Sequence, residues 1–296
     1  MLRPGARPGH AYFAGAPLLI AHRGGARLAP ENTMVAFVEA VELWGADMLE
    51  LDVRLSADGE VVVIHDEIVD RTTDGHGAVA DLTWAQLSAL DAGARFVDPE
   101  GAHSRAGQGI TIPRLADLLE RLPHVRLNIE AKCVEVAAPL QRVIVEHGAA
   151  HRVLFAAEHE RNRRPARGYP GPWGASRSQL LPFALLHRTP LSALYTPAAD
   201  ALQVPDRWPL NERGREVVTP RLMREAHRRN LPVHVWTVDE VEAMHRLLDL
   251  GVDGIQTDRP DRLARVLHER TGRALPPGLR APTGVPAGAP TPNPTP

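Results

Sequence analysis

Two histidines of this chain each follow a short apolar run and stand beside a charged residue. The two pairs are His22-Arg23, after residues 18–21, and His65-Asp66, after residues 61–64. Histidine titrates near neutral pH and can act as a general acid or base, which contributes about 10²–10⁴ to a rate. Arginine presents a planar fork of donors that matches a phosphate group. A lone histidine at a strand end is more often structural, but two such pairs favour acid–base chemistry on a phosphate ester.

Alternating apolar and charged residues in the segment 48–54 predict a strand that carries carboxylates on one face. Neighbouring side chains of a strand point to opposite faces, so Glu50 and Asp52 share a face while the apolar face packs under helices. Two carboxylates a few ångströms apart in a partly dry site repel by roughly 4 kcal/mol at an effective dielectric constant near 20. A cation is the simplest compensation for that repulsion.

The segment 126–132 repeats this alternation. The side chains on its polar face are Asn128, Glu130 and Lys132. Glu50, Asp52 and Glu130 then form an oxygen-only ligand set, which suits Mg²⁺ or Ca²⁺. The alternative is a pair of ion pairs inside the core, Glu50–Arg54 and Glu130–Lys132. Charged residues at strand centres are rarely buried without a function, which favours the metal site.

The scaffold for these residues is predicted by the order of apolar runs and amphipathic stretches. Their alternation is typical of β/α units around a parallel sheet. About eight runs are candidate strands: Leu18–His22, Met48–Arg54, Val61–His65, Arg126–Lys132, Val153–Ala157, Ala201–Val204, Pro232–Thr237 and Gly254–Asp258. Eight such units in about 250 residues fit an α/β protein of the TIM (β/α)8 barrel class, which keeps its chemistry at the carboxyl ends of the strands. The histidine and carboxylate motifs fall at those ends.

Other segments complete the outline of the molecule. We expect an N-terminal arm over 1–17, the barrel over 18–271 and a proline-rich disordered tail over 272–296. The span of about 67–112 is too long for an ordinary β/α loop and predicts a small insertion over the carboxyl-terminal mouth of the barrel. Three helix starts carry capping patterns, namely Thr83 with Gln86, Asp239 with Glu242, and Thr219 before Pro220.

Composition excludes several classes of partner. The formal net charge of −2 offers no strongly basic face for nucleic acid. No apolar run is long enough to span a bilayer, so we expect no stable membrane insertion. The single cysteine, Cys133, allows no intramolecular disulfide and fits a reducing compartment, which predicts a cytoplasmic protein. The expected partner is a small molecule, and the oligomeric state stays open.

A series of short motifs runs through the chain in order. They are Ala21-His22-Arg23-Gly24, Pro30-Glu31-Asn32-Thr33, Gly45-Ala46-Asp47, Glu50-Leu51-Asp52-Val53, Asp58-Gly59, Val63-Ile64-His65-Asp66, Asp70-Arg71-Thr72-Thr73, Ile129-Glu130-Ala131-Lys132, Trp236-Thr237-Val238, Gly251-Val252-Asp253-Gly254-Ile255 and Thr257-Asp258. Each motif alone is weak, but together they are specific. From Leu18 to Leu267 the chain closely resembles the glycerophosphodiester phosphodiesterase family.

The resemblance implies a TIM barrel that hydrolyses glycerophosphodiesters to glycerol 3-phosphate and an alcohol. It also implies one divalent cation, Mg²⁺ or Ca²⁺ with Mn²⁺ as a further option, on Glu50, Asp52 and Glu130. The other implied roles are an acid–base pair, His22 and His65, and two phosphate-binding residues, Arg23 and Lys132. Which histidine is the acid, and whether water or the glycerol hydroxyl attacks phosphorus, both stay open.

Two further residues have two interpretations each. Asn32 would border the metal and the phosphate, or else cap a helix over Thr33–Trp44. Trp236 would line the pocket, or else belong to the barrel core. The chain departs from the family pattern at Asp239 and at the end of the fifth strand, and its sixth strand is obscure, which puts the substrate in doubt more than the reaction.

Three other functions are alternatives. A lysophospholipase D or another lipid phosphodiesterase would use the same barrel with an apolar entrance, for which the insertion offers Trp84, Leu87, Leu90 and Phe96. Helical spacing makes these side chains a docking face first, so this alternative ranks lower. A non-catalytic phosphate-ligand binding protein would be expected to lack a histidine or carboxylate, and none is missing. A metal-dependent sugar isomerase gives no reason for adjacent His22 and Arg23.

Overall fold

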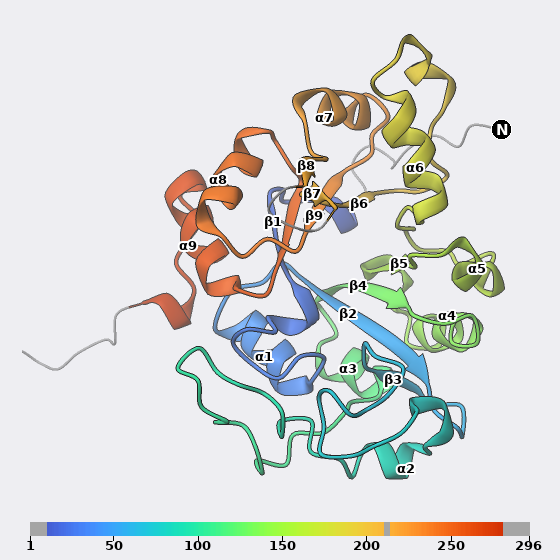
Figure 1. Cartoon of the computed structure of the whole chain (residues 1–296), viewed down its shortest axis with the longest axis vertical. Helices are drawn as coiled ribbons and strands as arrows, with labels where there is room; N and C mark the ends of the chain where they lie inside the picture. Colours follow the sequence, from blue (N-terminus) through green and yellow to red (C-terminus); the bar gives the residue numbers. More distant parts are fainter. Residues whose placement is uncertain (1–10, 210–213, 281–296) are drawn as a thin grey trace, which may run out of the picture.

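Parallel strands form the centre of the molecule in the computed structural model, which describes residues 11–209 and 214–280 (Figure 1). Their order across the curled sheet is β5-β4-β2-β1-β10-β9-β6. The bounds are β1 Leu18–Ala21, β2 Met48–Leu55, β4 Arg126–Ala131, β5 Val153–Ala156, β6 Leu202–Pro205, β9 Val233–Trp236 and β10 Gly254–Thr257. Each bound lies within one residue of the predicted one, so apolar run length located these strands well.

The space between the outer strands β5 and β6 is bridged by residues 173 and 174. Phe155 of β5 pairs in parallel with Trp173, and Gly174 pairs in parallel with Ala201, which precedes β6. The bridging residues lie in a segment rich in glycine, proline and arginine that carries no strand pattern. These pairings join the two edges of the curled sheet, and the fold is the predicted TIM-like barrel.

The expected third barrel strand, Val61–His65, is not part of the barrel ring. Strand β3, Val61–Val63, pairs antiparallel with β2, with Val53 opposite Val63. Only the turn 56–60 separates the two strands, and a parallel crossover needs a dozen or more residues. The prediction of a parallel strand here was wrong for that reason, because a connection this short permits only a hairpin. A separate two-stranded hairpin consists of β7, Arg207–Trp208, and β8, Arg215–Glu216.

Helices follow most of the barrel strands (Figure 1). Their bounds are α1 Met34–Glu42, α2 Trp84–Leu87, α3 Leu115–Arg121, α4 Ala137–Glu146, α5 Glu160–Arg163, α6 Arg177–Leu186, α7 Pro220–His227, α8 Val241–Asp249 and α9 Pro260–Thr271. The capping box of Thr83 and Gln86 and the cap of Thr219 before Pro220 are confirmed.

The capping box expected from Asp239 and Glu242 is wrong. Helix α8 follows Glu240, which makes no side-chain cap. The Asp239 carboxylate accepts hydrogen bonds from the Asp258 backbone N–H at 2.8 Å and from the Thr257 hydroxyl at 3.0 Å. Asp239 therefore holds the end of β10 in place. Its carboxylate is not available to cap α8, because it already accepts these two hydrogen bonds.

The barrel core has two parts. On the outer side of the sheet, Leu49 and Leu51 pack under the helices, as their alternation with Glu50 and Asp52 predicts. Inside the amino end of the barrel, a separate cluster surrounds Tyr12, which lies in the 3-10 turn Ala11–Phe13. This part of the predicted N-terminal arm closes the amino-terminal end of the barrel. The carboxyl-terminal end of the barrel is therefore the one that can hold a ligand cavity.

The insertion after β3 and the first part of the C-terminal segment are both ordered. The segment after β3 lies beside the carboxyl end of β2 and carries α2 with a small core of its own (Figure 1). The start of the predicted disordered tail is an ordered turn, Pro277–Leu279, in which the Gly278 N–H donates to the Leu43 carbonyl at 2.9 Å. The rest of that tail, 281–296, lies outside the described residues. Among the described residues, no helix has the length and apolar character needed to cross a membrane.

Candidate active site

A cavity of about 720 Å³ opens at the carboxyl ends of the barrel strands. Eight of the nine predicted site residues line it: His22, Arg23, Glu50, Asp52, His65, Glu130, Lys132 and Trp236. The ninth, Asn32, lies behind Asp52 and is buried. The structure therefore brings the residues of six separate sequence motifs to one place.

The three predicted metal ligands form a tight cluster. Asp52 of β2 and Glu130 of β4 are direct neighbours in the parallel register, and Glu50 lies two residues before Asp52 on the same face. Each carboxylate offers one oxygen within 4.8 Å of the others. Glu50 and Asp52 are buried, and Glu130 is partly exposed. Strand register and the two-residue period together explain why these three carboxylates meet.

Cations already compensate part of this negative charge. The Lys132 Nζ atom lies 3.1 Å from Asp52 and 3.2 Å from Glu130. The Arg23 Nε atom lies 3.2 Å from Asp52, and the Arg23 backbone N–H donates to Glu50 at 3.0 Å. Burial opposes ionisation, but Lys132 and Arg23 outweigh it and hold the pKa of Asp52 below its usual range. Burial and the charge of Asp52 raise the pKa of Glu50.

The alternative of two ion pairs inside the core, Glu50–Arg54 and Glu130–Lys132, is observed for one pair only. Lys132 does pair with Glu130, but Arg54 does not pair with Glu50. The Arg54 Nε–H instead donates to the backbone carbonyl of His65 at 2.8 Å. Arg54 thus ties the end of β2 to the loop that carries His65, and its guanidinium is not among the groups that line the cavity.

Both predicted acid–base histidines are held by a carboxylate at the same ring nitrogen. The Nδ1 atom of His22 lies 2.7 Å from Asp258, and that of His65 lies 2.6 Å from Asp66. This pairing places the proton on Nδ1 of the neutral ring and leaves Nε2 free for proton transfer. The His22 Nε2 atom lies 3.8 Å from Glu50.

The two histidines nevertheless have different pKa values. Burial of His22 disfavours its charge, but the carboxylates of Glu50 and Asp258 outweigh that effect and raise the pKa of His22 to about 9. For His65, burial dominates and lowers the pKa. A charged and a neutral imidazole in one cavity are what a paired acid and base require.

Asn32 positions a carboxylate and does not cap a helix. Its side-chain NH₂ donates to Asp52 Oδ2 at 3.0 Å, and its Oδ1 accepts from the Asp52 backbone N–H at 3.3 Å. The N-cap of α1 is Thr33, whose hydroxyl accepts from the Ala36 N–H. The capping alternative for Asn32 is wrong, because Asn32 has a left-handed backbone with φ of 57° that points its amide at β2.

Sequence reasoning from residue types missed the carboxylates and the arginine that support the site. Glu31 binds Arg23 at 3.0 Å and Arg71 at 2.7 Å, and Arg71 also contacts Asp66. These residues stand in the motifs Pro30-Glu31-Asn32-Thr33, Asp70-Arg71-Thr72-Thr73 and Val63-Ile64-His65-Asp66. Glu31 and Asp66 stand directly beside Asn32 and His65, which was the available signal for them. Arg71 has no candidate site residue in its motif, and its contact with Glu31 joins segments whose pairing the sequence does not show.

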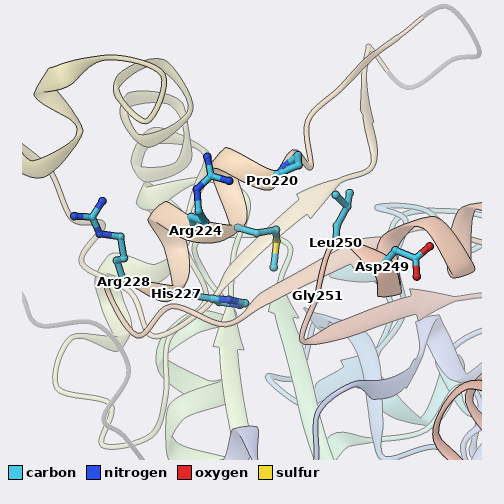
Figure 2. A pocket seen from close by; sticks show the side chains of 8 residues that line it. Pro220, Arg224, His227, Arg228, Asp249, Leu250 and Gly251 are labelled. Carbon is cyan, nitrogen blue, oxygen red and sulfur yellow. The ribbon is translucent and has the colours of Figure 1, made fainter.

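A second hollow of about 670 Å³ lies between α7 and the end of α8 (Figure 2). Arg224, His227 and Asp249 are among the side chains around it. The His227 Nε2 atom contacts Asp253 at 2.8 Å, but the only group of three potential metal ligands among the described residues is the one in the first cavity. The side chains for which the sequence predicts chemistry therefore lie in or beside the first cavity, not in this one.

A TIM-like barrel with two carboxylate-bound histidines, three clustered acids and two cations in one mouth is suited to a phosphoric-ester hydrolase. A family model described as the glycerophosphoryl diester phosphodiesterase family matches residues 22–262. The chain belongs to this family of enzymes.

Relatives and solved structures agree with that assignment. The chain is 35% identical over 259 residues to a glycerophosphodiester phosphodiesterase of Caldanaerobacter subterraneus, covering 85% of this chain and 98% of that protein. It is 30% identical to one of Bacillus subtilis, covering 84% and 86%. A glycerophosphodiester phosphodiesterase structure from Agrobacterium tumefaciens matches with a TM-score of 0.66 at 28% identity, covering 84% and 99%. A phosphodiesterase from Oleispira antarctica in complex with the product sn-glycerol-3-phosphate matches with a TM-score of 0.66 at 25% identity, covering 85% and 96%.

Proposed function

We propose that this protein hydrolyses glycerophosphodiesters to glycerol 3-phosphate and an alcohol, with one divalent cation and acid–base catalysis by two histidines. The observation that carries the proposal is the meeting of His22 and His65, each bound to a carboxylate at Nδ1, with three clustered acids in one cavity. Membership of the family supports the substrate class, as does the glycerol 3-phosphate in the Oleispira antarctica relative.

The donor set fits a hard divalent cation. Glu50, Asp52 and Glu130 would hold it through oxygen atoms, as Mg²⁺, Ca²⁺ and Mn²⁺ prefer. The Asn128 Oδ1 atom on the same face of β4 is buried without a hydrogen-bond partner among the described residues, which adds an unused oxygen beside the cluster. When bound, the cation would stabilise negative charge on the phosphate oxygens.

The protein's own side chains would perform the remaining steps. Arg23 and Lys132 would donate to the phosphate oxygens and orient phosphorus. One histidine would take the proton of the attacking hydroxyl group at Nε2, and the other would give a proton from Nε2 to the oxygen of the leaving alcohol. Asp258 and Asp66 would keep the two rings in the required tautomer.

The test is release of glycerol 3-phosphate, measured with a coupled assay on glycerophosphocholine and glycerophosphoethanolamine. His22→Ala and His65→Ala should each lower kcat/KM by about 10²-fold or more. His227→Ala is the matched control, because His227 also pairs with an aspartate but lies outside the cavity. Chelation should abolish turnover, and Mg²⁺, Ca²⁺ or Mn²⁺ should restore it. A protein that binds glycerol 3-phosphate but turns over neither substrate would be a non-catalytic binder instead.

A further inference from the structure

Arg71 joins the two sides of the candidate active site from outside the cavity. Its two terminal nitrogens donate to the two oxygens of Glu31, each at 2.7 Å, and its Nε–H donates to Asp66. We propose that Arg71 is a positioning residue for the proposed reaction, which fixes a catalytic histidine and a phosphate-binding arginine relative to each other. It acts on His65 through Asp66. It acts on Arg23 through Glu31. This inference rests on the proposed function, because it assigns a residue to the same site.

On the histidine side of Arg71, both oxygens of the Asp66 carboxylate are engaged. The Oδ1 atom lies 2.6 Å from Nδ1 of His65, and the Oδ2 atom accepts from the Nε–H of Arg71. A carboxylate that is held at both oxygens has a fixed plane, so the imidazole that it binds has a fixed orientation. A carboxylate bound to the ring alone could rotate together with it. Arg71 therefore limits the directions in which the free Nε2 atom of His65 can point.

On the arginine side, Glu31 accepts hydrogen bonds from two guanidinium groups. Its Oε1 atom lies 3.0 Å from Arg23 and 2.7 Å from Arg71, and its Oε2 atom accepts the other bond from Arg71. Burial opposes the ionisation of Glu31, but Arg71 and Arg23 outweigh that effect and lower its pKa. The carboxylate is thus charged and held in one place. It presents an oxygen to Arg23 from a fixed position.

The contacts of Arg71 argue against two other roles for this residue. All three of its guanidinium nitrogens donate to carboxylates, and Arg71 does not line the cavity, so it is not placed to bind phosphate. Its side chain is 48% exposed, and exposed ion pairs contribute little to folding stability. Loss of Arg71 should therefore disturb the geometry of the site much more than the stability of the fold.

The insertion holds the backbone of Arg71 through the turn that carries it. Val69 and Thr73, two residues away on either side, are fully buried. The Thr73 N–H and hydroxyl both donate to the Val69 carbonyl, at 3.1 and 2.9 Å. The Arg95 Nε–H, from further along the insertion, donates to the Thr73 carbonyl at 3.2 Å. Because the turn is already ordered, holding the Arg71 side chain costs only the entropy of that side chain.

This role also accounts for what the insertion contributes to the site. None of the described residues 67–112 lines the cavity, so the insertion does not form the apolar entrance that a lipid phosphodiesterase would use. Leu87 is fully buried in a local core instead, and Trp84 and Leu90 pack against that core. Val69 belongs to the same core, which therefore also supports the turn with the positioning arginine. The insertion acts on the site from outside the cavity.

The first test compares two arginine variants of the insertion. Arg71→Gln should lower kcat for glycerol 3-phosphate release by about tenfold or more and raise the inhibition constant of glycerol 3-phosphate by about threefold or more, while Tm changes by less than about 2 °C. Arg105→Gln is the matched control, because Arg105 binds Glu39 of α1 at 2.8 Å but lies away from the cavity, and it should leave both constants unchanged.

Two outcomes of this comparison have different meanings. If Arg71→Gln keeps the kcat and the inhibition constant of the unaltered protein, or if Arg105→Gln changes them equally, the inference is overturned and the proposed function stands. If the unaltered protein releases no glycerol 3-phosphate, the proposed function itself is contradicted.

A double-variant comparison tests the route through Asp66. In the Asp66→Asn background, Arg71→Gln should lower kcat by less than about twofold, since the contact that transmits its effect on His65 is already weakened. Losses that multiply in the double variant would show that Arg71 does not act through Asp66 and would overturn the inference.

Arg71→Lys separates the geometry of the guanidinium from its charge. Lysine keeps the charge but lacks the planar fork that binds both carboxylates at once. The lysine variant should therefore keep a kcat at least about fivefold below that of the unaltered protein. A full recovery of kcat by lysine would mean that charge alone suffices, and positioning by Arg71 would be refuted.

Discussion

Replacing Glu50 with glutamine should change thermal stability in opposite directions with and without a divalent cation. Glu50 is buried, and the ligand oxygens of the carboxylate cluster lie within 4.8 Å of one another. At that distance each pair of charges repels by about 3.5 kcal/mol at an effective dielectric constant near 20. Lys132 forms ion pairs with Asp52 and Glu130 but not with Glu50, which has His22 at 3.8 Å and the Arg23 backbone N–H at 3.0 Å instead.

The pKa of Glu50 gives the size of the effect. Burial and the Asp52 charge outweigh the attraction of His22 and Arg23 and raise this pKa to about 7. Relative to an ordinary value near 4.5, ionised Glu50 is disfavoured by about 3 kcal/mol. Glutamine can still accept the Arg23 N–H. We therefore expect Glu50→Gln to gain about 1–2 kcal/mol in chelator, which raises Tm by roughly 2–6 °C.

The pH dependence has the same origin. Because the folded pKa of Glu50 lies above the unfolded one, its stabilising contribution is present below about pH 4.5 and is lost as pH rises through 7. In chelator, the Tm of the unaltered protein should fall more steeply between pH 5 and 8 than that of Glu50→Gln. With saturating Mg²⁺ or Ca²⁺ the order should reverse, because a ligand at 100 times its Kd stabilises the folded state by about 2.7 kcal/mol.

The assay is differential scanning fluorimetry across pH, with chelator or with each cation. Asp117→Asn on the surface of α3 is the control, since Asp117 lies outside the cavity and its loss should leave the response to cation unchanged. A lower Tm for Glu50→Gln in chelator would refute the repulsion argument. An unchanged Tm of the unaltered protein on adding every cation would refute the metal site.

Three further predictions follow from single contacts. Asp258→Asn should lower kcat/KM by about 10–100-fold. It should also move the alkaline limb of the kcat/KM–pH profile to lower pH, because Asp258 raises the pKa of His22. An alkaline limb that does not move would contradict this role of Asp258. Asn32→Ala and Asn32→Gly should both weaken cation binding in calorimetry, because both remove the amide that holds Asp52. The alanine variant should also be less stable to urea than the glycine variant by about 1 kcal/mol, because the backbone φ at this position is 57°. His234 is buried, and burial lowers its pKa to about 4. Its contribution to folding stability is therefore present above about pH 6.5 and is lost as pH falls towards 4. His234→Leu should make the fall of Tm between pH 6.5 and 4 less steep, and an unchanged slope would contradict this role of His234.

The sequence predicted β2 and β4, which carry the clustered carboxylates, because alternation of apolar and polar residues along a strand fixes which side chains share a face. The period of two in 48–54 places Glu50 and Asp52 on one face whatever the partner strands are. Apolar run length located the barrel strands to within one residue. The wrong parallel strand at 61–65 was avoidable, because the five-residue turn before it already excludes a crossover.

Other features depend on contacts between distant segments, which a single sequence does not display. The last barrel position is filled by Trp173 and Gly174, whose pairing depends on β5 and Ala201 rather than on any strand-forming run. Asp239 looks like a helix cap, yet the end of β10 takes its carboxylate. Arg177 at the start of α6 likewise lies over the ring of Trp208, a contact between two segments that no local pattern pairs.

Arg23 shows why residue type alone does not define a role in this site. A left-handed backbone with φ of 50° lets its N–H reach Glu50 while its side chain reaches Asp52 and Glu31. Arg23 and Lys132 thus contact the same carboxylates that would hold a divalent cation. A cation on those carboxylates would replace this charge compensation and leave both side chains free for phosphate. The two binding events are coupled through shared charges, so the affinity for phosphate should depend on the cation and, by linkage, the affinity for the cation on phosphate.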